Sequence, residues 1–82
     1  MATRAYVVNA TWDDEAEVWV AVSDDVPGLV TEAEDFPRLI KKLQVMIPEL
    51  LEANGIVMED RGIDIPIELL AHRFITVSSP IS

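Results

Sequence analysis

The stretch Asp24-Asp25-Val26-Pro27-Gly28-Leu29-Val30-Thr31 divides the sequence into two unlike halves. Pro27 presets φ at the first central position of a turn, and Gly28 accepts positive φ at the next. The residues before this turn have the composition of strands, and those soon after it have the periodicity of a helix. The turn therefore marks the predicted change from a β-hairpin to a helix.

Two predicted strands with a short acidic connection precede the turn. Residues 4–12 and 17–23 are rich in β-formers and contain no Gly or Pro. The tetrapeptide Asp13-Asp14-Glu15-Ala16 separates them. A connection of this length is typical of a hairpin built on a type I turn, so we expect a hairpin here.

Pairing across that loop places Trp12 opposite Glu17, Ala10 opposite Trp19 and Val8 opposite Ala21. The other face of the hairpin then carries Val7, Asn9, Thr11, Val18, Val20 and Val22. Neither face is plainly polar, whereas a hairpin with one solvated face normally alternates cleanly. One helix covers one face, so the second face needs another subunit or a partner.

One helix is predicted after a short third strand over residues 29–33. Asp35 is a suitable N-cap, and Pro37 is tolerated in the first turn. The helix is expected from about Phe36 to Asn54, with Gly55 as the C′ residue. Its apolar face recurs at steps of three and four residues, at Phe36, Leu39, Ile40, Leu43, Ile47, Leu50 and Leu51.

Pro48 interrupts this helical pattern. Proline removes the hydrogen bond to the Gln44 carbonyl and typically costs about 3 kcal/mol inside a helix. We therefore expect the helix to be kinked near Gln44 to Pro48, or to be broken there into two pieces.

The remaining residues predict a loop and a last extended segment. Glu59-Asp60-Arg61-Gly62 reads as a polar loop, and odd-numbered apolar residues from Ile63 to Val77 keep a period of two. Pro66 restricts the first part to a sheet edge or to extended coil. The pattern predicts one last strand or two strand segments, with a short helical turn over residues 66–73 as the alternative. We expect the strand over residues 73–78, with a loose terminus after it.

Composition limits the classes of function. The 82 residues make one domain, residues 1–82, and carry six Lys and Arg against fifteen Asp and Glu, a formal charge of −9. Such a surface repels phosphate backbones and anionic lipids, which disfavours direct nucleic-acid or membrane binding, and it attracts basic proteins. The chain has no cysteine, no signal-peptide pattern and no apolar run of membrane-spanning length, so a cytoplasmic location is expected.

No catalytic, cofactor or metal site is predicted. The acidic pairs at Asp13-Asp14 and Asp24-Asp25 lack the alternating ligand pattern and central Gly of a Ca²⁺ loop, and turns favour Asp for other reasons. His72 is the single histidine, and no nucleophile motif accompanies it. We therefore expect a protein without enzymatic activity.

Four residues are the candidates for partner binding: Trp12, Trp19, Asp24 and Asp25. Large aromatic side chains dominate interface energetics, and carboxylates select a partner of opposite charge. Core packing on the sheet is an equally weighted role for the two tryptophans. The binding role keeps its weight because a small domain has little room to bury two indoles completely, and oligomeric contacts would cover them.

Several of these features together resemble the HicB-type antitoxin family. They are Tyr6-Val7-Val8, Trp19-Val20-Ala21, the turn at residues 24–31 and the Asp-capped amphipathic helix. More narrowly, residues 5–54 are similar to short stand-alone relatives classed as a domain of unknown function. The resemblance implies an α+β fold, β-β-β-α-β, with one helix on the sheet, similar to a truncated ribonuclease H-type fold without its active site. The last strand is then parallel to the first.

The resemblance also implies a function. Full-length members neutralise a small basic ribonuclease toxin, HicA, and carry a C-terminal DNA-binding module; we expect no separate module here. Our leading hypothesis is a HicB-like protein-binding domain that masks such a toxin by occlusion and forms a homodimer or higher oligomer. The alternative is a self-assembling domain that binds a small molecule or another cytoplasmic protein, with no toxin role.

Overall fold

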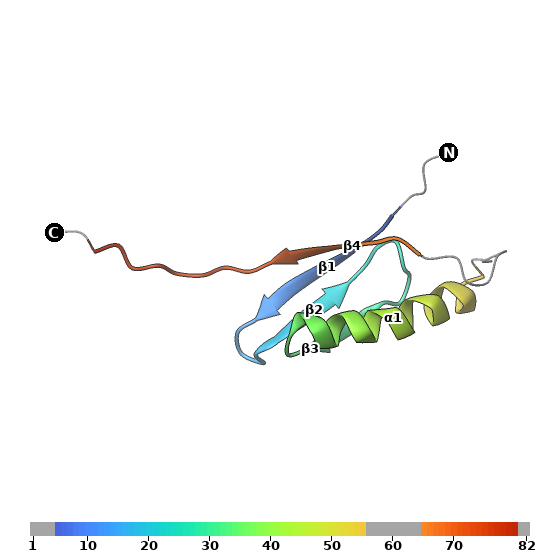
Figure 1. The fold of residues 1–82 in the computed structure, drawn as a ribbon, viewed down its shortest axis with the longest axis horizontal. Coiled ribbons are helices and arrows are strands. Elements are labelled where there is room, and N and C mark those ends of the chain that lie inside the picture. The colour runs from blue at the N-terminus through green and yellow to red at the C-terminus, as the bar shows by residue number, and fades with distance from the viewer. Residues whose placement is uncertain (1–4, 56–64, 81–82) are drawn as a thin grey trace.

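The chain folds into a four-stranded mixed sheet with a helix on one face (Figure 1). This is a computed structural model, and it describes residues 5–55 and 65–80. The order along the chain is β-β-β-α-β and the order in the sheet is β3-β2-β1-β4. The α+β class expected from the sequence is therefore confirmed. The elements are β1 (Tyr6–Asp13), β2 (Val18–Val22), β3 (Val30–Ala33), α1 (Phe36–Ala53) and β4 (Ile67–His72).

The predicted hairpin is present, but its predicted register is wrong by two residues. Trp12 lies opposite Trp19, and Ala10 lies opposite Ala21. The loop explains the shift, because Asp13 Oδ1 accepts from the backbone N–H of Glu15 (3.0 Å) and Ala16 (3.2 Å) and its carbonyl accepts from Glu17 N–H (2.7 Å). These bonds end β1 one residue later than predicted. A shift of two keeps every side chain on its predicted face.

The predicted turn at residues 26–29 is present. The N–H of Leu29 donates to the carbonyl of Val26 at 3.1 Å, and Gly28 has a φ of +85°. That positive φ at the third position is the geometry of a type II turn, which Pro at the second position favours. The chain then returns as β3, antiparallel to β2.

Helix α1 begins and ends at the predicted signals. Asp35 Oδ1 accepts a hydrogen bond from the backbone N–H of Arg38 at 2.9 Å, which is the N-cap bond. At the other end Gly55 has a φ of +77° and donates to the carbonyl of Glu52 at 3.1 Å. The helix is continuous through Pro48, so the alternative of two separate helices is wrong and a bend stays a prediction.

The last strand lies earlier in the chain than predicted. It spans Ile67–His72 and pairs parallel with β1, from Tyr6 beside Ile67 to Thr11 beside His72. Neither the strand over residues 73–78 nor the helical turn over residues 66–73 forms. Pairing stops at Thr11 and His72, two residues before β1 ends at Asp13, so in this register the chain beyond residue 74 has no part of β1 beside it. The predicted loop at residues 59–62 lies outside the described residues.

The core lies between the sheet and the helix. Its buried members are Val8, Ala10, Ala21, Val26, Leu29, Ala33, Leu39, Leu43, Ile47 and Leu51. The helix packs over β3 and β2 rather than over β4. This offset leaves the β4 side of the same sheet face less covered than the β3 side.

The segment 73–80, here called the C-terminal arm, continues the direction of β4 away from the rest of the protein (Figure 1). Its residues are all exposed. The radius of gyration is 16.0 Å, whereas a compact chain of this length has about 12 Å. The arm therefore makes the molecule elongated, with extents of 62 × 30 × 20 Å.

Candidate functional site

The two tryptophans form part of an aromatic row on the helix side of the sheet. The rings of Trp12 and Trp19 meet edge to face with centroids 5.4 Å apart, and Trp19 stacks on Phe36 at 4.5 Å. The Arg73 guanidinium lies over the Trp12 ring, 4.5 Å from its centroid. Both tryptophans are half-buried. The row therefore joins the hairpin, the start of α1 and the start of the arm.

Both tryptophan side chains are already in contact with other residues of the same chain. The indole N–H of Trp12 already donates to Asp14 Oδ1 at 2.7 Å. Trp19 packs against the core between Trp12 and Phe36. The structure thus gives both residues a packing role, and their predicted role as partner-binding anchors stays a prediction.

Asp25 ties the loop after β2 to the first strand. Its Oδ2 accepts from the backbone N–H of Val7 at 2.8 Å, and Ser23 Oγ donates to the Val7 carbonyl at 2.6 Å. Ser23 Oγ also accepts from the N–H groups of Asp25 and Val26, both at 3.1 Å. These two side chains extend the β1–β2 pairing beyond Val22, where the backbone ladder ends. Asp24 is exposed beside them.

The sheet face opposite the helix, here called the open face, is largely apolar, as the sequence predicted. The helix lies on the other side of the sheet (Figure 1). Val22, Val30 and Leu70 are 45%, 66% and 39% exposed there. By strand register the face carries Val7, Asn9, Thr11, Val18, Val20, Val22, Val30, Glu32, Glu68, Leu70 and His72.

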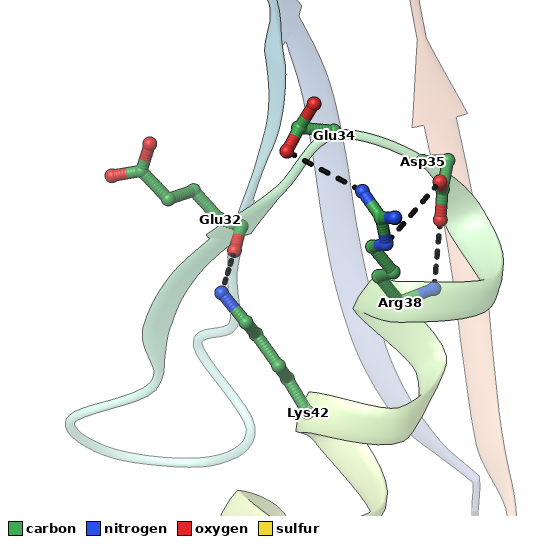
Figure 2. Close-up of polar contacts among 5 residues, drawn as sticks. All are labelled: Glu32, Glu34, Asp35, Arg38 and Lys42. Atoms are coloured by element: carbon green, nitrogen blue, oxygen red, sulfur yellow. Dashed lines mark hydrogen bonds and ion pairs between the residues drawn. The ribbon is translucent and has the colours of Figure 1, made fainter.

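Carboxylates border the open face at both edge strands. Glu32 lies on β3 and Glu68 on β4, and both are exposed. Lys42 donates to the backbone carbonyl of Glu32 at 2.6 Å, while the Glu32 carboxylate points away from it (Figure 2). The lysine therefore fixes the strand without neutralising that acid.

Two cations of the helix, Arg38 and Lys42, make polar contacts near its start. Arg38 contacts the carboxylates of Glu34 at 3.3 Å and Asp35 at 3.8 Å (Figure 2). Exposed pairs of this kind contribute little to stability. Their consequence is electrostatic, because they place positive charge beside the start of α1 and leave the rim of the open face acidic.

A second apolar surface lies between α1 and β4. It is a groove of about 610 Å³, lined on the helix side by Ile40, Leu43 and Ile47 and on the sheet side by Ile65, Ile67 and Leu69. This groove was not predicted, because the last strand was expected over residues 73–78, after His72. The period of two over residues 65–71 was the signal that could have found it.

Within residues 5–55 and 65–80, no three carboxylate, imidazole or thiol side chains cluster as metal ligands. In the same ranges no helix is both long enough and apolar enough to cross a bilayer.

Comparison with known proteins identifies the family. A search of curated proteins gave no match. Among solved structures, the chain is similar to hypothetical protein TTHA1013 from the extremely thermophilic bacterium Thermus thermophilus. The two sequences are 47% identical over 93% of this chain and 100% of the other, with a TM-score of 0.66. Residues 5–77 match the family described as Domain of unknown function (DUF1902), and the chain belongs to that family.

Proposed function

We propose that the chain is a cytoplasmic, non-enzymatic protein-binding domain whose open face docks a small basic protein. The observation that carries the proposal is the uncovered apolar face with acidic residues at its rim. Exposed apolar patches with a polar rim are typical of protein interaction sites. The open face supplies exposed apolar side chains, among them Val22, Val30 and Leu70.

Charge favours a basic partner. The chain has a formal charge of −9, and Glu32 and Glu68 border the open face. Such a field accelerates encounter with a positively charged protein and disfavours nucleic acids. The resemblance to HicB-type antitoxins supplies a specific partner, a HicA-type ribonuclease toxin. Its RNA-binding surface would be masked by occlusion, which requires no catalytic residue.

The test uses the full chain and the small basic protein encoded beside its gene, mixed and separated by size-exclusion chromatography with light scattering. We expect a stable complex and loss of the basic protein's ribonuclease activity. Val30→Arg should weaken the complex at least tenfold, because it places a cation on the surface that is proposed to receive a basic protein.

Val45→Arg is the matched control. Val45 is 62% exposed on the outer face of α1, close to the 66% of Val30, so the same change is made at the same exposure on the other side of the molecule. Equal affinity of the two variants would overturn the open face as the docking site. Failure of the wild-type chain to bind the basic protein would overturn the antitoxin-like function.

A further inference from the structure

We propose that the C-terminal arm pairs with β4 of a second copy of this chain, so that two sheets join into one across a two-fold axis. The proposal concerns the outer edge of β4, which adjoins the open face at Leu70, and it does not depend on the function proposed above. It rests on the exposed side chains of the arm, on the free edge of β4 and on the groove beside that edge.

The arm is apolar and uncovered. Phe74, Ile75 and Val77 are 100%, 71% and 77% exposed, and no strand in the described part of the chain pairs with residues 73–80. Large apolar side chains in this number are rarely left in water by a soluble domain. The arm cannot fold back as a continuation of the parallel pairing, because β1 ends at Asp13.

The edge of β4 is the complementary surface. β4 is the last strand of the sheet, so its outer backbone groups have no strand partner in the described chain. The groove between α1 and β4 lies beside this edge and is lined by Ile40, Ile67 and Leu69. A strand added antiparallel to β4 would satisfy these backbone groups and cover the groove, which is the β-augmentation mode of recognition.

One register matches every exposed apolar side chain of the arm. Antiparallel pairing about His72 sets Val77 beside the second copy's Ile67 and Ile75 beside its Leu69. Directly opposed residues point to the same face, so these arm residues lie on the groove side. Phe74 falls beside Leu70, on the opposite face.

Neighbouring registers are worse. A shift of two residues in one direction sets Phe74 beside Glu68, and a shift of two in the other sets Ile67 beside Ser79. A shift of one turns Ile75 and Val77 away from the groove. The apolar pattern therefore selects the register with His72 on the two-fold axis.

Charge identifies the arm as the segment that a second copy can accept. All fifteen acidic residues precede Leu69, so residues 69–82 carry no carboxylate side chain in a chain of formal charge −9. Two copies repel through most of their surface. The arm is the stretch that can approach an identical acidic molecule without adding to this repulsion.

A single introduced cysteine tests the register, because the chain contains none. Directly opposed residues of antiparallel strands have Cα atoms about 4.5–5.5 Å apart, which lies within the range that a disulfide spans. We expect His72→Cys to give a covalent dimer on mild oxidation. Thr76→Cys is the matched control, because the two copies of residue 76 lie eight residues apart in this register and should not crosslink.

Light scattering of the full chain tests the interface itself. The wild type should have twice the 9.1 kDa mass of one chain. The double variant Ile75→Glu/Val77→Glu should be a monomer with an unchanged circular dichroism spectrum, because both side chains are exposed in the single chain. Ser78→Glu/Ser79→Glu adds the same charge outside the apolar pairs and should remain dimeric.

Three results would overturn the proposal. One is a wild-type chain that stays monomeric in the micromolar range. Another is a dimer that survives Ile75→Glu/Val77→Glu but is lost with Val22→Glu, since that places the contact on the open face. The third is crosslinking through Thr76→Cys and not through His72→Cys, which assigns a different register.

Discussion

Ser23 shows how one hydroxyl can hold a loop to a strand. Its Oγ donates to the Val7 carbonyl and accepts from the N–H groups of Asp25 and Val26. A short polar side chain suits this task, because it reaches neighbouring backbone groups without filling space. Together with Asp25 it satisfies both backbone groups of Val7.

We predict that Ser23→Ala lowers the free energy of unfolding by about 1–3 kcal/mol, because partly buried backbone groups lose their hydrogen-bond partner. Urea denaturation followed by circular dichroism measures the change. Ser78→Ala is the control, since Ser78 is exposed in the arm, and it should leave the midpoint unchanged. Equal midpoints for both variants would show that solvent replaces the Ser23 bonds.

The predictions for single capping and turn residues were correct, because these roles depend on neighbouring residues in the chain. Asp35 caps α1, Gly28 takes the positive φ of the turn and Gly55 follows the helix, all as predicted. Each of these depends on a side chain and the backbone within a few residues. Glu17 was not foreseen in the left-handed region, with a φ of 56°, because a non-glycine residue gives no such signal.

At the scale of the element, α1 tolerates a proline in its interior. Pro48 cannot donate to the Gln44 carbonyl, yet the helix continues to Ala53. Burial of Leu43, Ile47 and Leu51 against the sheet stabilises the helix on both sides of the proline. Tertiary packing thus outweighs the local penalty.

Restoring the missing bond should stabilise the helix. We predict that Pro48→Ala raises the free energy of unfolding by about 1–3 kcal/mol, less than the full proline penalty because the native backbone has adjusted. Urea denaturation at fixed protein concentration measures it. Glu49→Ala is the control at the next exposed position and should change the midpoint little; equal effects of the two variants would contradict the argument.

The last strand was predicted over residues 73–78, but it forms at Ile67–His72. The period of two runs from Ile63 to Val77 and marks extended chain throughout, but it does not say which part has a partner. The pairing partner decides that: β4 pairs with β1 from Tyr6 and Ile67 to Thr11 and His72, and β1 itself ends two residues later, at Asp13. The hairpin register failed for a related reason, because the Asp13 side chain closes the loop one residue later.

At the scale of the whole molecule, net charge acts oppositely on the two proposed interfaces. Self-association brings together two chains of formal charge −9, whereas the open face is proposed to bind a basic protein. Salt screens both interactions, with a Debye length of about 10 Å at 0.1 M and about 3 Å at 1 M.

We therefore predict that raising the salt concentration over that range tightens the homodimer and weakens the complex with the basic partner. Analytical ultracentrifugation of the chain alone and of the mixture measures both dissociation constants. Neutral polymer osmolytes at matched osmolarity serve as the control for effects other than screening. A homodimer that weakens with salt would contradict the apolar contact proposed for the arm.

The sequence by itself determined the element types, their order, the two ends of the helix and the two apolar faces of the hairpin. These follow from propensity, capping, turn chemistry and periodicity, which act over a few residues. Only the tertiary structure decided which face α1 covers, where β4 lies, and that Trp19 packs between Trp12 and Phe36. It also placed the C-terminal arm beyond the sheet. Those outcomes depend on which surfaces meet across the fold, and residues distant in sequence compete for them, so no local pattern contains the answer.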